Sequence, residues 1–161
     1  MKTTIRKPQI NDGKDIWKLV KRIGNLDLNS EYCYFMTADL FSDHCAIVAD
    51  EDSQELLGFA LCIVKPEKKD TLFVWQIGVD QRAQGNGLAK KMINFIVDNQ
   101  DHKLSYIQAT VTDDNKSSRA LFSSIARFYK ADITKEIYID AANFNHSHHS
   151  EYLYNIGKLT Y

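Results

Sequence analysis

The sequence has almost no net charge and no long hydrophobic run, and each of these absences excludes a class of protein. Its 161 residues carry 20 Lys and Arg against 21 Asp and Glu, a formal net charge of −1, so the basic excess typical of nucleic-acid-binding proteins is absent. The longest apolar run, residues 56–64, is far shorter than the ~20 residues that a membrane-spanning helix needs. We therefore expect neither a nucleic-acid partner nor a membrane partner.

The sequence also lacks paired cysteines and a secretion signal, which predicts a cytoplasmic location. Cys33, Cys45 and Cys62 are odd in number, lie among apolar residues and lack C-x-x-C spacing, as is typical of reduced, buried thiols. The first nine residues, MKTTIRKPQ, contain no apolar segment of the kind that directs secretion. The length and the ordinary composition, 44% hydrophobic and 25% charged, predict a single domain over residues 1–161.

Hydrophobic periodicity and turn residues predict an α/β fold. Apolar residues at 16, 19, 20 and 23 share one face of an expected helix that Asn11 or Asp12 can cap, and Ser30 can cap a second helix that ends near Phe41. The expected strands cover residues 3–7, 45–50, 56–64, 72–79, 106–111, 132–139 and 151–156, and two further helices cover residues 88–99 and 116–129. The resulting order, βααβββαβαββ, predicts a mixed central sheet.

The rest of the chain is organised around residues 71–89, TLFVWQIGVDQRAQGNGLA. The first part is apolar, β-branched and aromatic, which predicts a buried strand, and Gly85-Asn86-Gly87 then leads into an amphipathic helix. This arrangement favours phosphate binding, because the free N–H groups of a first helical turn can bind an anion. The Gly-Lys-Ser/Thr of a Walker A loop is absent, and so is the third glycine of a dinucleotide-binding fingerprint.

The glycine loop resembles the coenzyme loop of the GNAT N-acetyltransferase superfamily. Gln84-x-x-Gly87-x-Ala89 matches its Q/R-x-x-G-x-G/A signature, and Arg82-x-x-Gly85-x-Gly87 matches two residues earlier, so two registers are open. The expected element order is that of the GNAT (acyl-CoA N-acyltransferase) fold. The resemblance implies acetyl-CoA as co-substrate, held by Ile77, Gly78, Val79, Arg82, Gln84, Gly85, Asn86, Gly87, Leu88, Ala89, Asn115, Ser118, Arg119 and Phe122.

Further stretches are similar to one branch of that superfamily, the L-2,4-diaminobutyrate acetyltransferases of ectoine biosynthesis. They are D-L-N-S-x-Y-x-Y from residue 27, F-V-W-Q from residue 73, A-T-V-T from residue 109 with N-x-x-S-x-A-L-F from residue 115, and H-x-x-E from residue 148 before I-G at residue 156. The wider superfamily shares neither the first nor the last. The resemblance implies a homodimer that transfers acetyl from acetyl-CoA to the γ-amine of L-2,4-diaminobutyrate.

The same resemblance implies the residues of an amine site. Asp27 and Glu151 can meet ammonium groups, and the rings of Trp75 and Tyr32 can face a cation, a contact worth about 0.5–2 kcal/mol each. The other expected members of the substrate site are Trp17, Asn29, Ser30, Tyr34, Thr110 and Thr112. Ordinary capping and strand pairing explain Asn29, Ser30, Thr110 and Thr112 equally well, and core packing is the simpler explanation of Trp17.

Acetyl transfer also needs a group that takes the proton of the amine. Freeing a side-chain ammonium near pH 7 costs about 4 kcal/mol, and the resemblance offers Glu151 and His148 as the catalytic residues. Without the resemblance, Glu151 would be interpreted as a surface carboxylate of an edge strand. Many members of the superfamily carry a tyrosine that protonates the departing thiolate, where this chain has Phe122. The thiolate can still leave unaided, because a thiol pKa is about 8.5.

Three alternatives remain open beside this interpretation. His146, His148 and His149 lie in one polar loop, but no cysteine or carboxylate stands at zinc-finger spacing, so we expect no metal. An acetyltransferase for another small amine, such as a polyamine, lysine or ornithine, fits many of the same residues. A non-catalytic acetyl-CoA-binding module is favoured only by Phe122, whereas Asp27 and Glu151 favour an amine pocket.

Overall fold

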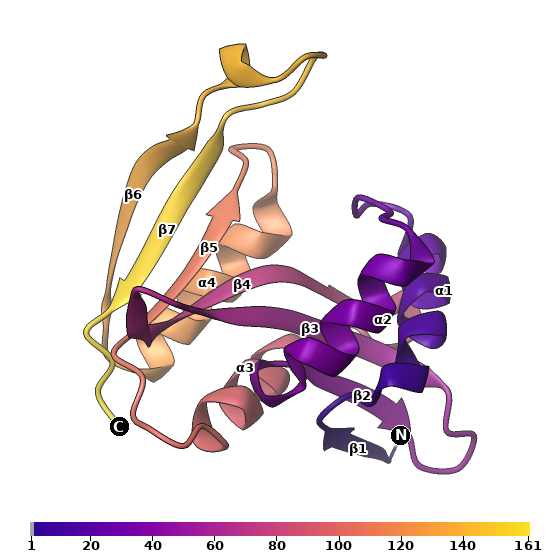
Figure 1. The fold of residues 1–161 in the computed structure, drawn as a ribbon. Coiled ribbons are helices and arrows are strands. Elements are labelled where there is room, and N and C mark those ends of the chain that lie inside the picture. Colours follow the sequence, from indigo (N-terminus) through magenta and orange to yellow (C-terminus); the bar gives the residue numbers. More distant parts are fainter. Residues whose placement is uncertain (1) are drawn as a thin grey trace. The chain divides into compact units, whose positions relative to one another are not determined.

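The computed structural model describes residues 2–161, and its elements follow the expected order βααβββαβαββ (Figure 1). Short 3-10 helices lie between some of them, and Gln81–Ala83 is the one that matters for the site. The strands are β1 (Thr3–Arg6), β2 (Ala46–Asp50), β3 (Leu56–Lys65), β4 (Lys68–Val79), β5 (Tyr106–Val111), β6 (Asp132–Ile139) and β7 (Glu151–Gly157), and the helices are α1 (Gly13–Ile23), α2 (Glu31–Leu40), α3 (Leu88–Asp98) and α4 (Lys116–Phe128).

Two local features differ from the expectation. Strand β4 begins four residues before the predicted start, at Lys68 rather than residue 72, because its first residues are polar and carry no hydrophobic signal. Asp12 holds the N-cap position of α1 without capping it, since its carboxylate binds Arg6 at 2.8 Å and the Gln9 N–H at 2.6 Å. The predicted cap at Ser30 is confirmed.

The chain forms two compact units, and the first comprises residues 2–63 and 75–101. Strands β1, β2 and β3 pair antiparallel in it. Phe59 and Leu61 of β3 join the apolar core formed with α1 and α2. Gly58 lies on the opposite face, where a side chain would meet Met92 of α3 at 3.2 Å. Helices α1 and α2 therefore cover one face of these strands, and α3 covers the other.

The second unit comprises residues 64–74 and 102–161. The first half of β4 pairs parallel with β5, β5 pairs antiparallel with β7, and β7 pairs antiparallel with β6. Helix α4 buries Phe122, Ile125 and Ala126 on one face and contacts β6 and β7. The core of the unit is formed by α4 and by buried residues of β4, β5 and β7.

Hydrogen bonding gives one mixed sheet of seven strands, in the order β1-β2-β3-β4-β5-β7-β6. Strand β4 contributes residues to both units. Strand β6 lies at an edge, and all eight of its residues are exposed. Within residues 2–161, no helix has both the length and the apolar character needed to cross a membrane.

Candidate active site

The loop between β4 and α3 has the open form that an anion site requires. Gly85 and Gly87 take left-handed conformations, with φ of 80° and 68°, that residues with side chains rarely adopt. A Cβ at either position would meet no atom within 4 Å, and the Asn86 side chain bonds back to the main-chain oxygens of Ala83 and Gln84. Gly87 is the N-cap of α3, so the first N–H groups of that helix are available to an anion.

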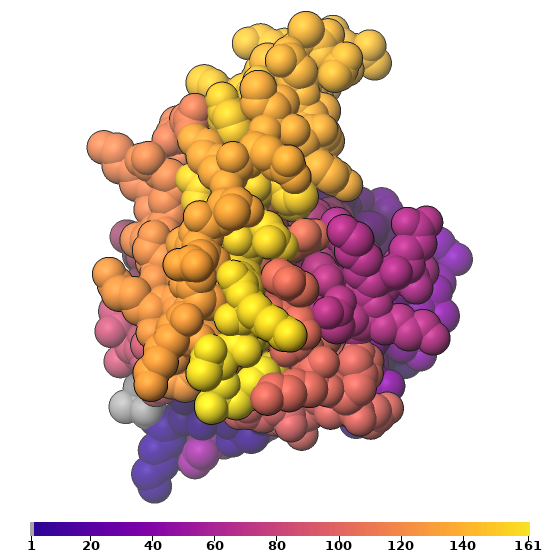
Figure 2. All heavy atoms as spheres, turned by 90° about the vertical axis from the view of Figure 1, so that its left-hand side faces the viewer, coloured from indigo at the N-terminus to yellow at the C-terminus, as the bar shows by residue number. Residues whose placement is uncertain are grey.

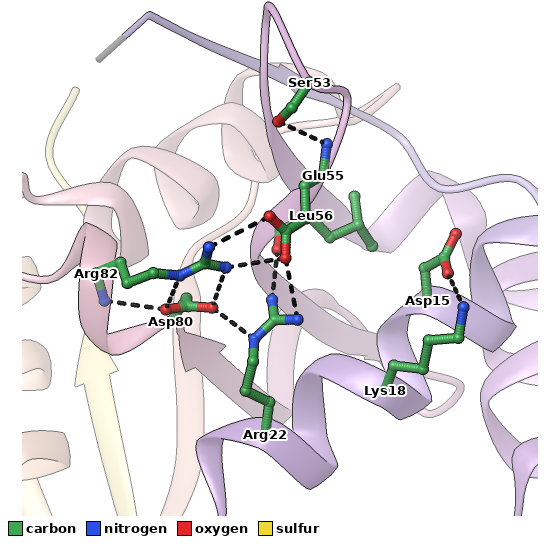
Figure 3. A network of polar contacts seen from close by, with 8 residues as sticks. All are labelled: Asp15, Lys18, Arg22, Ser53, Glu55, Leu56, Asp80 and Arg82. Atoms are coloured by element: carbon green, nitrogen blue, oxygen red, sulfur yellow. Dashed lines mark hydrogen bonds and ion pairs between the residues drawn. The ribbon is translucent and has the colours of Figure 1, made fainter.

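A network of four charged side chains fixes the start of this loop (Figure 3). The Asp80 carboxylate accepts hydrogen bonds from Arg22 Nε at 2.7 Å and from Arg82 Nε at 3.0 Å, and Glu55 pairs with both arginines at 3.1 and 2.9 Å. The Asp80 side chain is only 4% exposed, and its hydrogen bonds from Arg82 hold the pKa of that carboxyl well below its ordinary value. The network joins α1, the start of β3 and the loop between β4 and α3.

The ion pairs of Arg82 bear on the two motif registers. Its guanidinium is committed to the carboxylates of the network, whereas Gln84 makes only a 3.4 Å hydrogen bond to the Val79 oxygen. Gly87 belongs to both registers, and Ala89 lies in the first turn of α3. The Arg82 charge is therefore already paired, and Gln84 carries no such ion pair.

A hollow of about 420 Å³ lies beside the network. It exposes mainly polar groups of the loop between β4 and α3 and of the end of α1. The residues around it are Arg22, Ile23, Asn25, Val79, Asp80, Gln81, Arg82 and Gln84.

Gly78, expected at the coenzyme, lies in close packing within the first unit. A Cβ there would lie 2.8 Å from the Leu26 side chain, 2.9 Å from that of Ile23 and 3.0 Å from that of Phe59. A larger residue at this position would therefore require those side chains to move. Ile77 and Val79, on either side, are partly buried.

Four residues of the first unit that are expected at the amine site lie close together, and one of them is a buried tyrosine. Tyr34 of α2 is fully buried, and its Oη lies 3.1 Å from Gln76 Oε1 and 3.3 Å from the Asn29 main-chain nitrogen. Gln76 Nε2 donates to the main-chain oxygen of Asp27 at 2.7 Å. The ring of Trp75, 37% exposed, lies with its centroid 6.5 Å from that of Tyr34. The structure thus brings Asp27, Asn29, Tyr34 and Trp75 together.

The other three expected substrate residues of this unit lie in different environments. The Ser30 hydroxyl caps α2 by accepting the Cys33 N–H at 3.3 Å. Tyr32 is 69% exposed. Trp17 packs against the hydrophobic core, and the ammonium of Lys21 lies 5.1 Å from its ring centroid. Capping and packing therefore account for Ser30 and Trp17.

In the second unit, the first turns of α4 carry the remaining expected coenzyme residues. The Asn115 side chain caps the helix by accepting the Ser118 N–H at 3.0 Å. Arg119 Nε is buried and has no hydrogen-bond partner among residues 2–161, and the charge of Arg119 contributes to the lowered pKa of Asp113 and of Asp114. Phe122 is 2% exposed and belongs to the core.

The two expected threonines lie at the end of β5. Thr110 pairs with Leu153 of β7 and is partly buried, as is Thr112. A hydrogen bond from Thr112 is the main influence that lowers the pKa of Asp114, and His149 Nε2 lies 3.8 Å from the Asp114 carboxylate. Thr112 therefore already has a polar partner within its own unit.

The two expected catalytic residues lie next to each other. His148 Nε2 is 3.9 Å from Glu151 Oε1, and their side chains are 28% and 21% exposed. The ring of Phe144 stacks on the imidazole, with centroids 3.9 Å apart and planes 17° apart, which fixes its orientation. In the part of the chain that the structure describes, no group of three His, Cys, Asp or Glu side chains is placed to hold a metal ion.

Sequence reasoning assigned no role to Gln76 or to the Arg22, Glu55 and Asp80 network. Gln76 is a polar residue inside an otherwise apolar strand, and that is a signal from which its buried hydrogen bonds could have been inferred. The network joins residues 58 positions apart and leaves no local pattern.

Comparison with known proteins shows similarity along the whole chain. The family model described as Acetyltransferase (GNAT) family matches residues 15–126. The L-2,4-diaminobutyric acid acetyltransferase of Marinococcus halophilus is 37% identical over 156 residues, covering 96% of this chain and 89% of that protein. The protein of the same name from Shouchella clausii is 38% identical over 158 residues, covering 97% and 87%.

Solved structures extend this comparison to three dimensions. Diaminobutyrate acetyltransferase EctA of Paenibacillus lautus, in complex with L-2,4-diaminobutyric acid and coenzyme A, superimposes with a TM-score of 0.91 at 33% identity, covering 98% of this chain and 95% of that one. The ribosomal-protein-S18-alanine N-acetyltransferase of Escherichia coli gives a TM-score of 0.72 at 14% identity, covering 99% and 96%. The second likeness concerns the fold alone.

Proposed function

Since the chain belongs to the acetyltransferase (GNAT) family, we propose that it transfers the acetyl group of acetyl-CoA to the γ-amine of L-2,4-diaminobutyrate. The products are N4-acetyl-L-2,4-diaminobutyrate and CoA, and the pathway is ectoine biosynthesis. The observation that carries the proposal is the likeness, over 98% of this chain, to an enzyme that holds diaminobutyrate and coenzyme A. Curated relatives of the same activity cover 96% and 97% of the chain.

The open glycine loop fits the pyrophosphate of the coenzyme. Gly85 and Gly87 leave the space in front of α3 free, and the N–H groups of that helix supply donors. The buried, unpartnered Nε of Arg119 supports a second anion contact. In this proposal Arg82 holds the loop in place rather than binding phosphate, because its charge is already paired.

The proposed amine site uses a carboxylate and an aromatic ring from the first unit. Asp27 binds an ammonium group of the substrate, and the half-exposed face of Trp75 contacts the same cation. A diamino acid carries two ammonium groups and one carboxylate, so a site of this kind favours diamines over neutral amines.

We assign the acid–base step to Glu151, with His148 orienting it. The Glu151 carboxylate first takes a proton from the substrate ammonium, and the neutral amine then attacks the thioester carbonyl. The C–N bond forms, the C–S bond breaks, and the second proton of the nitrogen is lost to water. The 3.9 Å separation and the stacked imidazole support the pairing. Phe122 has no hydroxyl, so CoA leaves as the thiolate, which its thiol pKa of about 8.5 allows.

A thiol-release assay with purified protein and acetyl-CoA tests this function. We expect rapid release of CoA with diaminobutyrate and slow release with ornithine, lysine, a polyamine or no amine. Equal or greater turnover with one of the other amines identifies a different small-amine acetyltransferase. Binding of acetyl-CoA without turnover of any amine identifies the non-catalytic module that Phe122 leaves open.

We further propose that the protein acts as a homodimer through strand β6. The strand lies at an edge of the sheet and pairs only with β7 among the described strands. Its exposed apolar residues are Ile133, Ile137, Tyr138 and Ile139, with 37%, 59%, 52% and 36% of their surface accessible. Figure 2 looks onto the second unit, where β6 appears in orange along the surface. Proteins ordinarily protect the edge strands of their sheets from pairing with other chains. A second copy of this chain would cover the β6 edge.

The proposed setting is the cytoplasm, with residues 1–161 acting as one N-acetyltransferase domain. Cys33, Cys45 and Cys62 are all free, and Cys45 and Cys62 are buried, which supports a reducing compartment. Burial raises the pKa of Cys45 to about 12, so that thiol stays protonated. The contribution of β4 to both compact units supports a single domain.

A further inference from the structure

The side chains of Tyr34 and Gln76 form a buried polar clamp on the segment between α1 and α2. Tyr34 Oη lies 3.3 Å from the Asn29 nitrogen and 3.3 Å from the Asp27 oxygen, and Gln76 Nε2 donates to the same Asp27 oxygen at 2.7 Å. The two side chains also bond to each other at 3.1 Å. Tyr34 is 0% and Gln76 is 9% exposed, so the clamp is shielded from water. Hydrogen bonds in the protein interior are stronger than those in water.

The clamp acts where the chain has no regular structure. Residues 24–30 lie between the end of α1 and the start of α2 and belong to no helix or strand. Segments of this kind are ordinarily more mobile than the elements that they connect. Here the main chain at Asp27 and Asn29 is bonded to one residue of α2 and one residue of β4. The clamp therefore sets the position from which the Asp27 carboxylate projects.

The same clamp lies against the aromatic part of the amine site. Trp75 directly precedes Gln76 in β4, and its ring is tilted by 31° to that of Tyr34 at a centroid distance of 6.5 Å. The clamp thus bonds the main chain of Asp27 and lies beside the ring of Trp75. A carboxylate and an aromatic ring are the two features that recognise an ammonium ion.

We propose that Tyr34 and Gln76 are positioning residues that set the diamine selectivity of the enzyme by holding Asp27 and Trp75 at a fixed separation. The inference rests on the proposed function, in which Asp27 binds a substrate ammonium. We assign both a positioning role because their polar groups bond within the clamp and their side chains are buried, 0% and 9% exposed. One extra methylene in a fitted binding site can change discrimination by about 10–200-fold, so a segment held by two buried side chains can discriminate between amines that differ by one methylene.

Tyr34→Phe and Gln76→Met test the clamp, because each removes hydrogen-bonding groups and keeps most of the buried volume. We expect the KM for diaminobutyrate to rise about tenfold in each variant, with kcat and the Kd for CoA unchanged, as loss of uniform substrate binding predicts. The preference for diaminobutyrate over ornithine should fall in parallel. Tyr154→Phe is the matched control, since it removes the hydroxyl of another buried tyrosine, 8% exposed, outside the clamp.

A double-mutant cycle with Asp27→Asn separates positioning from simple stabilisation. If Tyr34 acts through Asp27, the double variant should raise the KM no further than Asp27→Asn alone. Additive effects, or a lowered Tm with an unchanged KM and unchanged selectivity, would overturn the inference while the wild type still acetylates diaminobutyrate. A wild type that does not acetylate diaminobutyrate would instead overturn the proposed function, and the inference with it.

Discussion

The Asp80 carboxylate accepts a hydrogen bond from Arg22 Nε at 2.7 Å, which ties the last turn of α1 to the loop that follows β4. The same carboxylate accepts the main-chain N–H of Arg82 at 2.9 Å and so caps the short helix Gln81–Ala83. One nearly buried carboxylate therefore bonds both the last turn of α1 and the start of the loop between β4 and α3.

Asp80→Asn should lower stability near neutral pH. Loss of the charged acceptor should lower the free energy of unfolding by about 2 kcal/mol and the Tm by roughly 4–8 °C. The folded-state pKa of Asp80 lies below its ordinary value, so the carboxylate stabilises the fold above the unfolded-state pKa of about 3.9 and loses this effect as the pH falls through the folded-state pKa. The Tm difference between wild type and variant, measured from pH 7 down to pH 3, should be largest near pH 7 and become smaller below about pH 4.

Asp15→Asn is the matched control for this experiment. Asp15 pairs with Lys18 at 3.0 Å, but the two side chains are 55% and 53% exposed, and exposed ion pairs contribute little. Its Tm should stay within about 2 °C of the wild type. Equal changes in both variants would show that the buried network has no special role.

Gly87→Glu should abolish coenzyme binding. The added side chain and negative charge would occupy the space in front of α3 that the structure leaves open. Gly87→Ala is the control, because it introduces the same backbone strain at φ 68°, about 1–2 kcal/mol, without the charge. Calorimetry with CoA should show a loss of more than about 10²-fold for the glutamate variant and a smaller loss for alanine. Unchanged affinity in a folded glutamate variant would place the coenzyme elsewhere.

Diaminobutyrate should be a better substrate than ornithine, and ornithine better than lysine. A site that contacts both ends of the molecule fixes the distance between them, and each added methylene moves the reacting amine by about 1 Å, which can cost about 10²-fold in kcat/KM. Steady-state kinetics with the three amines at saturating acetyl-CoA measures this. Comparable kcat/KM values across the series would favour an acetyltransferase of broad amine specificity.

Ile137→Lys should produce a monomer. The substitution places a charge on the most exposed isoleucine of β6, 59% accessible, and a charged edge opposes strand pairing between copies. Leu40→Lys is the control, since Leu40 is an exposed apolar residue of α2, 67% accessible, outside the proposed interface. Sedimentation should give a dimer for the wild type and the control, and a monomer for Ile137→Lys. A dimer in all three would exclude this part of β6 from the interface.

The fold was predictable because its elements carry local signals. The apolar stripe of α1, the Ser30 cap and the glycine pair before α3 each depend on residues a few positions apart, and the structure contains all of them. The polar start of β4 was missed because Lys68 and Lys69 carry no strand signal and are ordered by the pairing of the hairpin with the rest of the sheet.

The contacts that organise the site were not predictable from local patterns. The bond from Tyr34 to Gln76 joins residues 42 positions apart, and the bond from Gln76 to Asp27 joins residues 49 apart. Such pairs are set by packing, so the sequence named Tyr34 as a substrate residue without showing that its hydroxyl is buried. Glu55, which pairs with Arg82 from just before β3, lies 27 positions away and likewise leaves no local pattern.

The proton of the amine gives the last prediction. Near pH 7 an ammonium with a pKa of about 10 must lose its proton before it can attack, at a cost of about 4 kcal/mol. If Glu151 only binds the cation, Glu151→Gln should raise the KM and leave kcat nearly unchanged. If it also accepts the proton, kcat should fall about 10²-fold or more. We expect the second result, because a carboxylate beside an ammonium can bind it and take its proton through the same oxygen.

The pH dependence separates these roles further. As the pH rises towards the pKa of the amine, free amine becomes abundant and the need for a base disappears, so the kcat of Glu151→Gln should partly recover. His148→Ala should show a smaller loss, since the imidazole 3.9 Å away orients the carboxylate and Phe144 holds its ring. A loss in His148→Ala as large as that of Glu151→Gln, with the same recovery, would make histidine the base. Near wild-type kcat/KM at every pH in both variants would mean that water alone removes the proton.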